Sequence, residues 1–387
     1  MFKRNIEKEL FSLAKDYPVV TVVGPRQSGK TTLVRHVFKN KPYVNLEAID
    51  IQELAKNDPR GFLKKYPEGA VLDEIQRCPN LLSYIQLIVD EKEQKGIFIL
   101  TGSHQIELHQ AITQSLAGRT ALLNLLPMSI FELEQSGFKL SVDELIFKGG
   151  YPRIYKDQLD PTKAYRNYFQ TYIERDLRQL IHVKDLSQFQ KFVRLCASRI
   201  GQLINLSSIG GEIGISSHTV NEWISILEAS FIVFRLHPYF ENLGKRIVKT
   251  PKLYFTDVGL VCYLLGIQDL SHLERDPLRG QLFENLVILE LIKQRLNQGL
   301  DPELYFFRDL HGHEVDLIFR SGHSLTPIEI KSSETFNSSF LKNLKFFQEL
   351  VGSRAPKSYV IYAGENEQMG DLFSLLNLKN VGLTIGH

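Results

Sequence analysis

Hydrophobic positions in the first third of the chain alternate between short continuous runs and helical spacing. The run Val-Val-Thr-Val-Val at residues 19–23 is β-branched and uninterrupted, the pattern of a strand buried on both faces of a parallel sheet. Apolar runs recur at residues 70–72 and 97–100, and helical patterns such as residues 81–89 separate them. Strands that alternate with helices indicate an α/β domain with a parallel sheet, which we place at residues 1–130.

The middle of the chain has a different pattern. Residues 131–200 show mostly helical spacing, interrupted at Gly149-Gly150-Tyr151-Pro152, and we expect a helical connector or lid there. In residues 201–268, a turn at Gly214-Ile215-Ser216 precedes a second amphipathic stretch at residues 217–228, and two strand-like runs follow. A helix, a turn, a helix and a hairpin predict a winged helix.

The last part, residues 269–387, alternates helix and strand patterns in the order helix, strand, hairpin, strand, helix, strand. We therefore expect a second α/β domain at the end of the chain. The sequence contains no internal repeat and no low-complexity tract.

Composition narrows the class of protein. The chain has 387 residues, 43% of them hydrophobic and 23% charged, which fits a globular protein of several domains. The formal net charge is +2, so any nucleic-acid signal must be local. Three separated cysteines without a CxxC pair, no apolar signal segment and no run of roughly 20 apolar residues predict a cytoplasmic protein without a membrane span.

The first run of candidate chemistry follows the strand at residues 19–23. It matches the pattern GxxxxGK[ST], in which glycines let backbone amides approach phosphates, a lysine reaches the β- and γ-phosphates and a hydroxyl binds Mg²⁺. The lysine is Lys30 and the hydroxyl is that of Thr31. The predicted nucleotide-binding residues of this loop are Gly24, Pro25, Arg26, Gln27, Ser28, Gly29, Lys30, Thr31 and Thr32. ATP with Mg²⁺ is the expected ligand.

Two acidic residues end the next apolar run. We expect Asp73 to hold Mg²⁺ through water, and Glu74 to polarise the attacking water as a general base. The apolar run at residues 97–100 ends in Thr-Gly-Ser, where a hydroxyl such as that of Ser103 can sense the γ-phosphate or orient water. A plain turn at the end of the strand is the alternative. Arg119 is a candidate arginine finger, acting within the chain or across a subunit boundary, and a surface salt bridge is the alternative.

A second group of charged residues lies in the last domain. Asp316 falls on one predicted strand and Glu329 and Lys331 on the next, where their i, i+2 spacing puts them on one face. Glu284 lies in an otherwise apolar helix and needs a partner. Asp316, Glu329 and Glu284 offer hard oxygen ligands for Mg²⁺, and Lys331 can position water or stabilise phosphate charge. A buried salt-bridge network is the alternative. His311 and His313 lie nearby, and this His-x-His spacing could bind a metal. We expect them instead to be solvated or to orient the strand.

These residues carry a family resemblance. The chain resembles bacterial and archaeal AAA-type P-loop ATPases that end in a C-terminal domain of unknown function. The motifs are Gly-Pro-Arg-Gln-Ser-Gly-Lys-Thr-Thr (24–32), Leu-Asp-Glu-Ile-Gln (72–76), Thr-Gly-Ser (101–103), Ser-Leu-Ala-Gly-Arg (115–119), Tyr-Ile-Glu-Arg-Asp-Leu (172–177), Pro-Lys-Leu-Tyr-Phe-Thr-Asp-Val-Gly-Leu (251–260), Phe-Glu-Asn-Leu-Val (283–287), Arg-Asp (308–309), Glu-Val-Asp-Leu-Ile (314–318) and Ile-Glu-Ile-Lys-Ser (328–332). The resemblance implies an ATPase core, a winged helix and a nuclease-like terminal domain. The order Glu, Asp, Glu-x-Lys resembles the D–(D/E)xK site of the restriction-endonuclease-like fold.

Local basic excess makes DNA the expected partner. Residues 163–199 hold eight Lys or Arg against three Asp or Glu, and a solvated helix face is the alternative explanation. The hairpin after the predicted recognition helix is also basic, and such a wing can contact phosphates without reading sequence. Its cations are Arg235, Lys245, Arg246, Lys249 and Lys252, against Glu241 alone. A winged helix that contacts protein is the alternative.

The sequence therefore predicts an ATP-binding and ATP-hydrolysing protein that associates with nucleic acid, with an ATP-gated Mg²⁺-dependent nuclease domain. The alternative is an ATP-switched regulatory or scaffold protein whose nuclease-like domain is inactive. A homo-oligomer is compatible with both.

Overall fold

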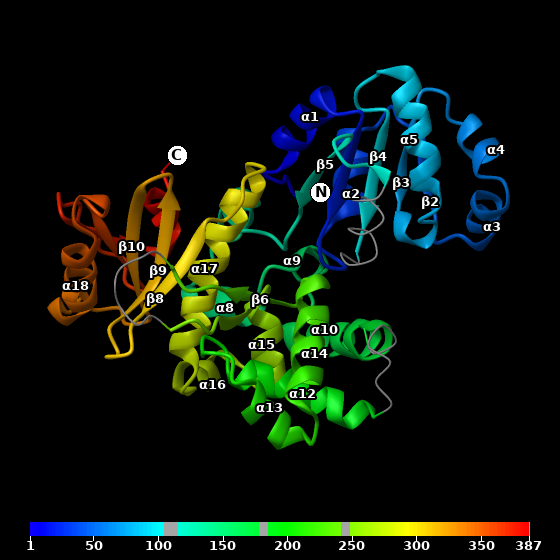
Figure 1. Ribbon diagram of the computed structural model, residues 1–387. Coiled ribbons are helices and arrows are strands. Elements are labelled where there is room, and N and C mark those ends of the chain that lie inside the picture. The colour runs from blue at the N-terminus through cyan, green and yellow to red at the C-terminus, as the bar shows by residue number, and fades with distance from the viewer. Residues whose placement is uncertain (104–114, 178–184, 241–247, 387) are drawn as a thin grey trace. The chain divides into compact units, whose positions relative to one another are not determined.

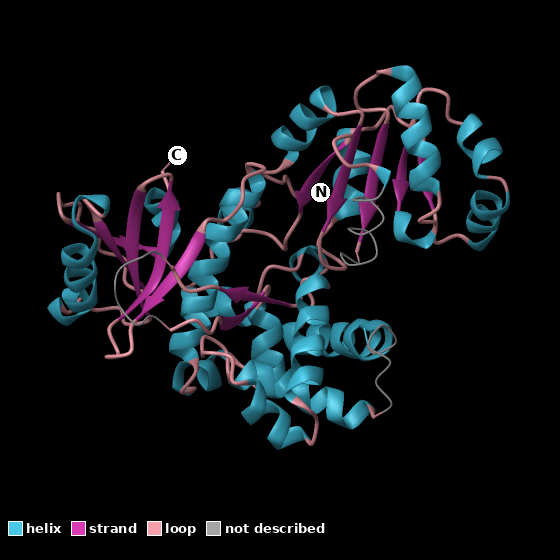
Figure 2. Cartoon of the chain, viewed as in Figure 1, coloured by secondary structure: helices cyan, strands magenta, loops and turns pink. Residues whose placement is uncertain are grey.

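The computed structural model describes residues 1–103, 115–177, 185–240 and 248–386. The chain divides into two compact units, residues 1–128 with 229–231 and 295–300, and the remainder from residue 129 onward. Each unit has its own sheet and its own hydrophobic core (Figures 1 and 2).

The first unit is built on a five-stranded parallel sheet in the order β2-β3-β4-β1-β5. The strands are β1 (Val19–Val23), β2 (Tyr43–Asn45), β3 (Ala70–Asp73), β4 (Phe98–Gly102) and β5 (Thr120–Asn124). Every residue of β1, β3 and β4 is buried, which confirms that their continuous apolar runs are central strands.

Helices connect these strands. They are α1 (Glu7–Asp16), α2 (Lys30–Val37), α3 (Ile49–Asn57), α4 (Pro59–Lys64), the short η1 (Ile75–Arg77) and α5 (Leu81–Lys92). Helices α1 and α2 pack on the sheet through Leu10, Leu33 and Val34, which join Val20 and Val22 in one core cluster. The predicted α/β domain with a parallel sheet is confirmed.

The second unit begins with a helical part. Its elements are α7 (Ile130–Gln135), α8 (Val142–Lys148), α9 (Pro152–Lys156), α10 (Pro161–Tyr168), η2 (Phe169–Leu177), α12 (Leu186–Ser198), α13 (Leu206–Ile213), α14 (Ser217–Ala229), β6 (Val233–Leu236), β7 (Lys252–Phe255), α15 (Val258–Leu265) and α16 (Leu270–Arg275). The predicted break at residues 149–152 separates α8 from α9.

The turn between α13 and α14 has a specific backbone requirement. Gly214 ends α13 with φ 76°, and a Cβ on Gly210 would lie 2.4 Å from the carbonyl oxygen of Ile215. Trp223 of α14 packs edge-on against Phe192 of α12, with ring centroids 5.2 Å apart. The two helices and the antiparallel pair β6–β7 thus lie where the sequence predicted a helix-turn-helix and a hairpin.

The second unit ends in a mixed five-stranded sheet in the order β12-β11-β10-β9-β8. Its elements are the long helix α17 (Arg279–Asn297), β8 (Leu304–Arg308), β9 (Glu314–Ser321), β10 (Ser324–Lys331), η3 (Ser338–Leu341), α18 (Lys342–Val351), η4 (Gly352–Arg354), β11 (Ser358–Tyr362), β12 (Phe373–Asn377) and η5 (Leu378–Thr384). Two strands follow α18, whereas the sequence predicted one before it and one after it. The residues between β10 and α18 are mostly polar and cannot fill a buried strand.

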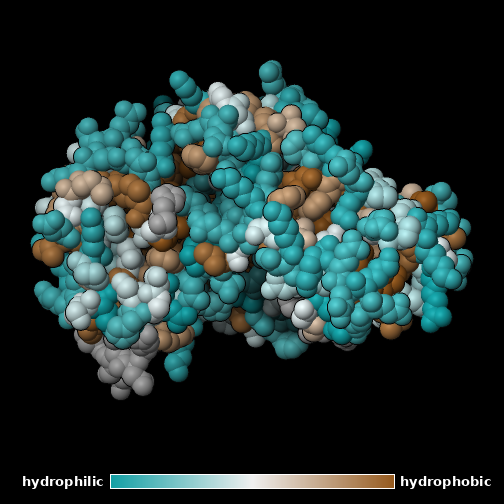
Figure 3. Space-filling model, turned by 90° about the horizontal axis from the view of Figure 1, so that it is seen from above, coloured by the Kyte–Doolittle hydropathy of each residue, from teal (hydrophilic) through white to brown (hydrophobic). Residues whose placement is uncertain are grey.

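The surface shown in Figure 3 is mostly hydrophilic, with apolar side chains scattered over it. Across the described residues, no helix is both long enough and apolar enough to cross a membrane.

A buried aspartate holds the helical part of the second unit together. Asp257, only 3% exposed, caps α15 by accepting a hydrogen bond from the amide of Leu260 at 3.1 Å. Its carboxylate also accepts from the Gly150 amide at 2.7 Å and from the Tyr165 hydroxyl at 2.6 Å. The carboxylate therefore ties α15 to α10 and to the break before α9. Burial raises the pKa of Asp257, while these donors oppose the rise.

Replacing this carboxylate should destabilise the second unit more than removing an ordinary helix cap. We expect Asp257→Ala to lower the free energy of unfolding by about 3 kcal/mol, because it leaves buried donors unsatisfied. Asp269 is the control, since it caps α16 by accepting from the His272 amide at 2.9 Å but is exposed. Urea titrations measure the free energy of unfolding of both variants. Asp269→Ala should lower it by about 1 kcal/mol, and an equal loss for the two variants would contradict the linking role of Asp257.

Candidate functional site

The predicted phosphate loop lies between the carboxyl end of β1 and the amino end of α2, which begins at Lys30. Gly24 has φ 154°, and a Cβ there would lie 2.2 Å from the carbonyl oxygen of Leu125. Gly29 has φ 97° and leads into the helix. The backbone conformation at both positions therefore requires glycine. The backbone amides of the loop are left free to bind an anion at the positive amino end of α2.

Lys30 turns back over this loop. Its side chain is buried, and Nζ donates hydrogen bonds of 2.9 Å to the carbonyls of Gly24 and Pro25. Burial lowers the pKa of Lys30 to about 8, against the opposing effect of Glu74 and Asp73. The ammonium thus shapes the loop at the position from which a lysine in this motif reaches phosphates.

The other loop residues differ in exposure. Gln27 and Thr32 are exposed, Arg26 is partly buried with Glu47 4.0 Å away, and Ser28 is buried. The Ser28 carbonyl accepts a 2.8 Å hydrogen bond from Arg4, which also donates to the Leu126 carbonyl at 2.7 Å. Arg4 therefore braces the loop, a role that no local sequence pattern signalled.

Asp73, at the carboxyl end of β3, is surrounded by hydroxyl groups. Thr31 Oγ1 lies 3.1 and 3.0 Å from its two carboxylate oxygens, and Tyr43 donates to it at 2.7 Å. Thr101 of β4 donates to the same carboxylate. Tyr43 was missed in the sequence; the only signal was its place on a short strand before the acidic one. Burial and the Asp73 contact raise the pKa of Tyr43.

Glu74 follows in a left-handed backbone conformation, with φ 58°. Its amide donates to Thr101 Oγ1 at 3.1 Å, and its carboxylate accepts from Ser103 Oγ at 3.0 Å and from the Gln76 side chain. A non-glycine residue in this region is uncommon and often marks a functional position. Ser103, predicted as a phosphate sensor, holds the carboxylate of Glu74 in this structure.

Arg119 lies near the amino ends of the strands, whereas the phosphate loop lies at their carboxyl ends. It directly precedes β5, whose first residue Thr120 pairs with Val19 at the amino end of β1. The loop follows the carboxyl end of that strand, five residues later, roughly 16 Å along it. Arg119 forms a two-pronged exposed ion pair with Asp90, at 2.5 and 2.8 Å. In this structure its side chain pairs with Asp90, and the arginine-finger role, within the chain or across a subunit boundary, stays a prediction.

In the second unit, the structure brings Asp316, Glu329 and Lys331 together. Lys331 Nζ lies 2.7 Å from Glu329 and 3.2 Å from Asp316, and the amide of Ile330 donates to Asp316 at 2.8 Å. Burial and the neighbouring Asp316 raise the pKa of Glu329 to about 8, although Lys331 opposes the rise. The hairpin turn at residues 322–323 joins their strands, as predicted.

Glu284 has different partners from those predicted. It accepts from Lys252 at 3.2 Å and from the Tyr254 hydroxyl, and Lys252 also contacts Glu314 at 2.6 Å. Among the described residues, no three or more His, Cys, Asp or Glu side chains are placed to hold a metal ion. Lys252 and Lys331 stand beside these carboxylates, and the shared Mg²⁺ site of Glu284, Asp316 and Glu329 stays a prediction.

The basic wing also needs correction. Lys252 is 3% exposed and turned inward, and Arg235 donates to Glu228 at 2.9 Å and to Asn221 at 3.0 Å. Lys245, Arg246 and Glu241 lie outside the described residues, while Lys249 is exposed. Helix α14 itself contains no Lys or Arg.

The two nearby histidines are not arranged as a metal pair. His313 Nδ1 lies 2.9 Å from Asp309, and its ring stacks on Phe346 with centroids 3.8 Å apart. The His311 amide donates to the same aspartate at 2.8 Å. The expectation that these histidines orient the chain is consistent with these contacts.

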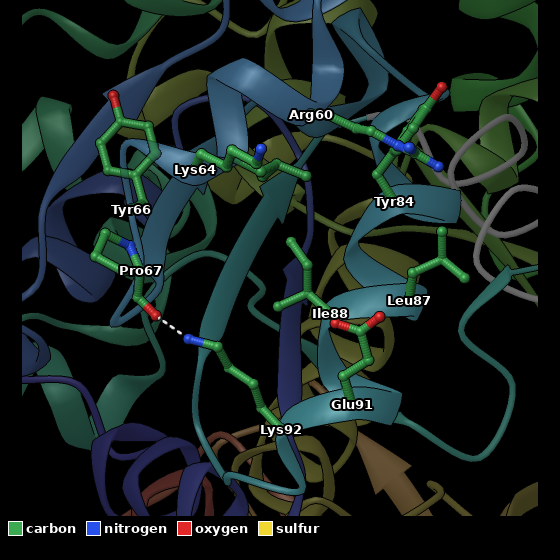
Figure 4. Close-up of a pocket in the computed structure, with 10 residues that line it drawn as sticks. Arg60, Lys64, Tyr66, Pro67, Tyr84, Leu87, Ile88, Glu91 and Lys92 are labelled. Atoms are coloured by element: carbon green, nitrogen blue, oxygen red, sulfur yellow. Dashed lines mark hydrogen bonds between the residues drawn. The ribbon is translucent and has the colours of Figure 1, made fainter.

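A pocket of about 460 Å³ lies between α4 and α5, away from the phosphate loop (Figure 4). Leu87, Ile88 and Tyr84 line its α5 side, and Lys92 closes one end by donating to the carbonyl of Pro67. None of its lining residues was predicted to be functional.

The phosphate loop, the hydroxyl-bound aspartate and the adjacent glutamate on a parallel sheet define the class of P-loop ATPases. Residues 16–134 match the family model described as AAA domain. Residues 139–271 and 279–381 match two models described as domains of unknown function, DUF8612 and DUF4143.

The comparison with whole proteins agrees. An uncharacterized protein of Mycobacterium tuberculosis, Rv2008c, is 31% identical over 355 residues, which cover 90% of this chain and 77% of that protein. MJ1637 of Methanocaldococcus jannaschii is 21% identical over 345 residues, in an alignment that covers 75% of this chain and 71% of that protein. The chain belongs to this family of AAA-type P-loop ATPases with a C-terminal domain of unknown function. Among solved structures, the Walker-type ATPase PABY2304 of Pyrococcus abyssi has 15% sequence identity and a TM-score of 0.47. The alignment covers 68% of this chain and 96% of the PABY2304 chain.

The shifted pKa of Lys30 predicts how nucleotide affinity depends on pH. Phosphates favour the ammonium form, so binding above the free pKa of about 8 must take up a proton. We expect the Kd for ATP to be insensitive to this group below that pH and to rise by up to about tenfold per pH unit above it. Titrations of ATP from about pH 7 to about pH 9.5 would show the rise. Lys30→Arg, whose charge persists, should lack it, and a flat wild-type profile would contradict the assignment.

Proposed function

We propose that the protein hydrolyses ATP with Mg²⁺ at the carboxyl edge of the first sheet. The observation that carries the proposal is the contact of Thr31 with both carboxylate oxygens of Asp73, directly beside Glu74. A hydroxyl and a carboxylate at this separation are hard oxygen groups of the kind that Mg²⁺ takes, directly or through water. The residues present therefore fit the ion, which would neutralise developing charge on the phosphates.

Each residue then has a defined task. Lys30 exchanges its contacts with the Gly24 and Pro25 carbonyls for the β- and γ-phosphates. Glu74 takes a proton from the attacking water. Ser103 and Gln76 donate hydrogen bonds to the Glu74 carboxylate. Because Ser103 directly follows β4, a movement of the carboxyl end of this strand would shift the general base. Thr101 and Tyr43 fix Asp73.

A second copy of the chain is part of this proposal. Because Arg119 lies near the amino ends of the strands, away from the loop of its own chain, we propose that it approaches the nucleotide of a neighbouring chain. A guanidinium supplied in this way stabilises charge on the transferred phosphoryl group. The exposed pair with Asp90 is weak enough to open, because water and salt screen an ion pair at the surface.

For the second unit, we propose a nuclease site at Asp316, Glu329 and Lys331, in an ATP-gated and nucleic-acid-associated protein. Their convergence on adjacent strands supports it. Such a site would use the carboxylates for Mg²⁺ and Lys331 for water or phosphate.

The alternative is an ATP-switched regulatory or scaffold protein with an inactive terminal domain. The burial of Lys252 among the carboxylates favours this alternative, because it neutralises groups that a cation would need. ATP hydrolysis that DNA accelerates would favour the nucleic-acid role over the scaffold. We also propose that a winged helix contacts DNA. This proposal is based on the helix-turn-helix and on the cations Lys245, Arg246 and Lys249.

Removing the proposed base should separate nucleotide binding from turnover. We expect Glu74→Gln to bind ATP normally and to hydrolyse it at least about 100-fold more slowly, because the carboxamide cannot accept the proton. Steady-state phosphate release and binding of labelled ATP measure the two properties. Lys30→Ala should lose binding itself, and Glu91→Gln, on the rim of the separate pocket, should change neither. Turnover of Glu74→Gln at the wild-type rate would exclude this glutamate as the base.

The nuclease proposal has its own test. Wild-type protein with Mg²⁺ should cleave single- or double-stranded DNA, and Asp316→Ala should remove this cleavage while ATP hydrolysis continues. Asp371→Ala, an exposed aspartate of the same sheet domain, is the control and should cleave normally. If the purified wild-type protein cleaves neither substrate with or without ATP, the scaffold alternative replaces the nuclease.

A further inference from the structure

Lys252 occupies an unusual position for a lysine. Its backbone belongs to β7 in the helical part, where it pairs with Leu236 and forms a bridge with Leu203. Its side chain, 4% exposed, extends to α17 and β9 instead of to solvent. A buried ammonium is unstable without compensation, so the surrounding carboxylates are what hold it there.

These contacts form one charged cluster. Lys252 Nζ lies 2.6 Å from Glu314 and 3.2 Å from Glu284, and it lies 5.4 Å from the centre of the Phe306 ring. The carboxylates of Glu284, Glu314 and Asp316 raise the pKa of Lys252 in spite of its burial. Burial and the neighbouring Asp316 raise the pKa of Glu284, although Lys252 opposes the rise. Asp316 and Glu329 share Lys331. Arg308, 3.2 Å from Glu314, closes the outer side.

The cluster is not fully satisfied by these cations. Glu329 is 4% exposed, and its Oε2 has no hydrogen-bond partner among the described residues, although Oε1 contacts Lys331. A buried carboxylate oxygen without a donor is costly, and a further positive ligand beside Asp316 would satisfy it.

We propose that the Lys252 ammonium is an internal substitute for a divalent cation in this cluster, so that Glu314, Asp316 and Glu329 bind a hard cation only when the charge of Lys252 is removed or withdrawn. Lys252 and the cation compete for the Glu314 carboxylate, and a second positive charge at about 3 Å is repelled, whereas Asp316 and Glu329 are contacted by Lys331. The site is that of the proposed nuclease. The inference depends on the carboxylates of that site alone. It requires that they bind a cation, and it does not require that the protein cleaves DNA.

The test uses Mn²⁺ as the probe and the nucleotide-free full-length chain. Lys252→Met keeps much of the side-chain volume and removes the charge. We expect it to bind one Mn²⁺ more than the wild type, with an affinity at least about tenfold higher than any binding of the wild type at this cluster. Isothermal titration and the paramagnetic resonance signal of free Mn²⁺ measure both quantities. Adding Asp316→Asn to Lys252→Met should abolish the extra site, and Lys252→Arg should not create it.

Loss of the lysine leaves buried carboxylates uncompensated, so Lys252→Met should melt at a lower temperature and recover stability with Mn²⁺ more than the wild type does. If it does not fold, Lys252→Met combined with Glu284→Gln removes one charge of each sign and should fold. This pair should also gain the Mn²⁺ site. A folded variant of either kind that binds no more Mn²⁺ than the wild type overturns the proposal, whether or not the wild type cleaves DNA.

Discussion

The parallel register of the first sheet is the constraint on which the nucleotide site depends. Strands β1, β3 and β4 run side by side in one direction, so their carboxyl ends meet at one edge. That edge receives the phosphate loop, Asp73 and the hydroxyl of Thr101, and side chains from three other segments converge on the Asp73 carboxylate. The same register places Arg119 beside the amino end of β1, away from the loop that follows its carboxyl end. A single rule of strand direction thus explains both the composition of the site and the position of Arg119.

The second unit is organised instead by charges that are buried and must find partners. Asp257 draws three donors from separate segments, and Lys252 draws carboxylates from α17 and β9. Glu290 likewise accepts from the amide of Ile130 at 2.7 Å and contacts Lys293 at 2.8 Å. Such contacts are directional and costly to break, so they define how helices and sheet meet. They also explain why charged positions in this unit carry structural weight apart from any chemistry.

Much of the fold and of the ATP site could be predicted because their signals are local. An uninterrupted β-branched strand, a glycine-rich turn and a lysine at a helix start are contiguous, and Asp73 and Glu74 end the next strand of their kind. Tyr43 and Arg4 gave no such signal, since their contacts depend on register and on a terminal segment folding back. Lys252 was misplaced on an exposed wing because a basic residue beside a hairpin looks solvated. Only the distant carboxylates of Glu284 and Glu314 explain its burial.

The inward position of Lys30 has a consequence for the kinetics of nucleotide capture. Its bonds to Gly24 and Pro25 keep the loop in a curved shape without help from phosphate. Capture then requires the exchange of two local hydrogen bonds, not the folding of a disordered loop, so little ordering entropy opposes it. Association should accordingly be limited by diffusion and orientation, and differences in affinity between nucleotides should arise in their residence times.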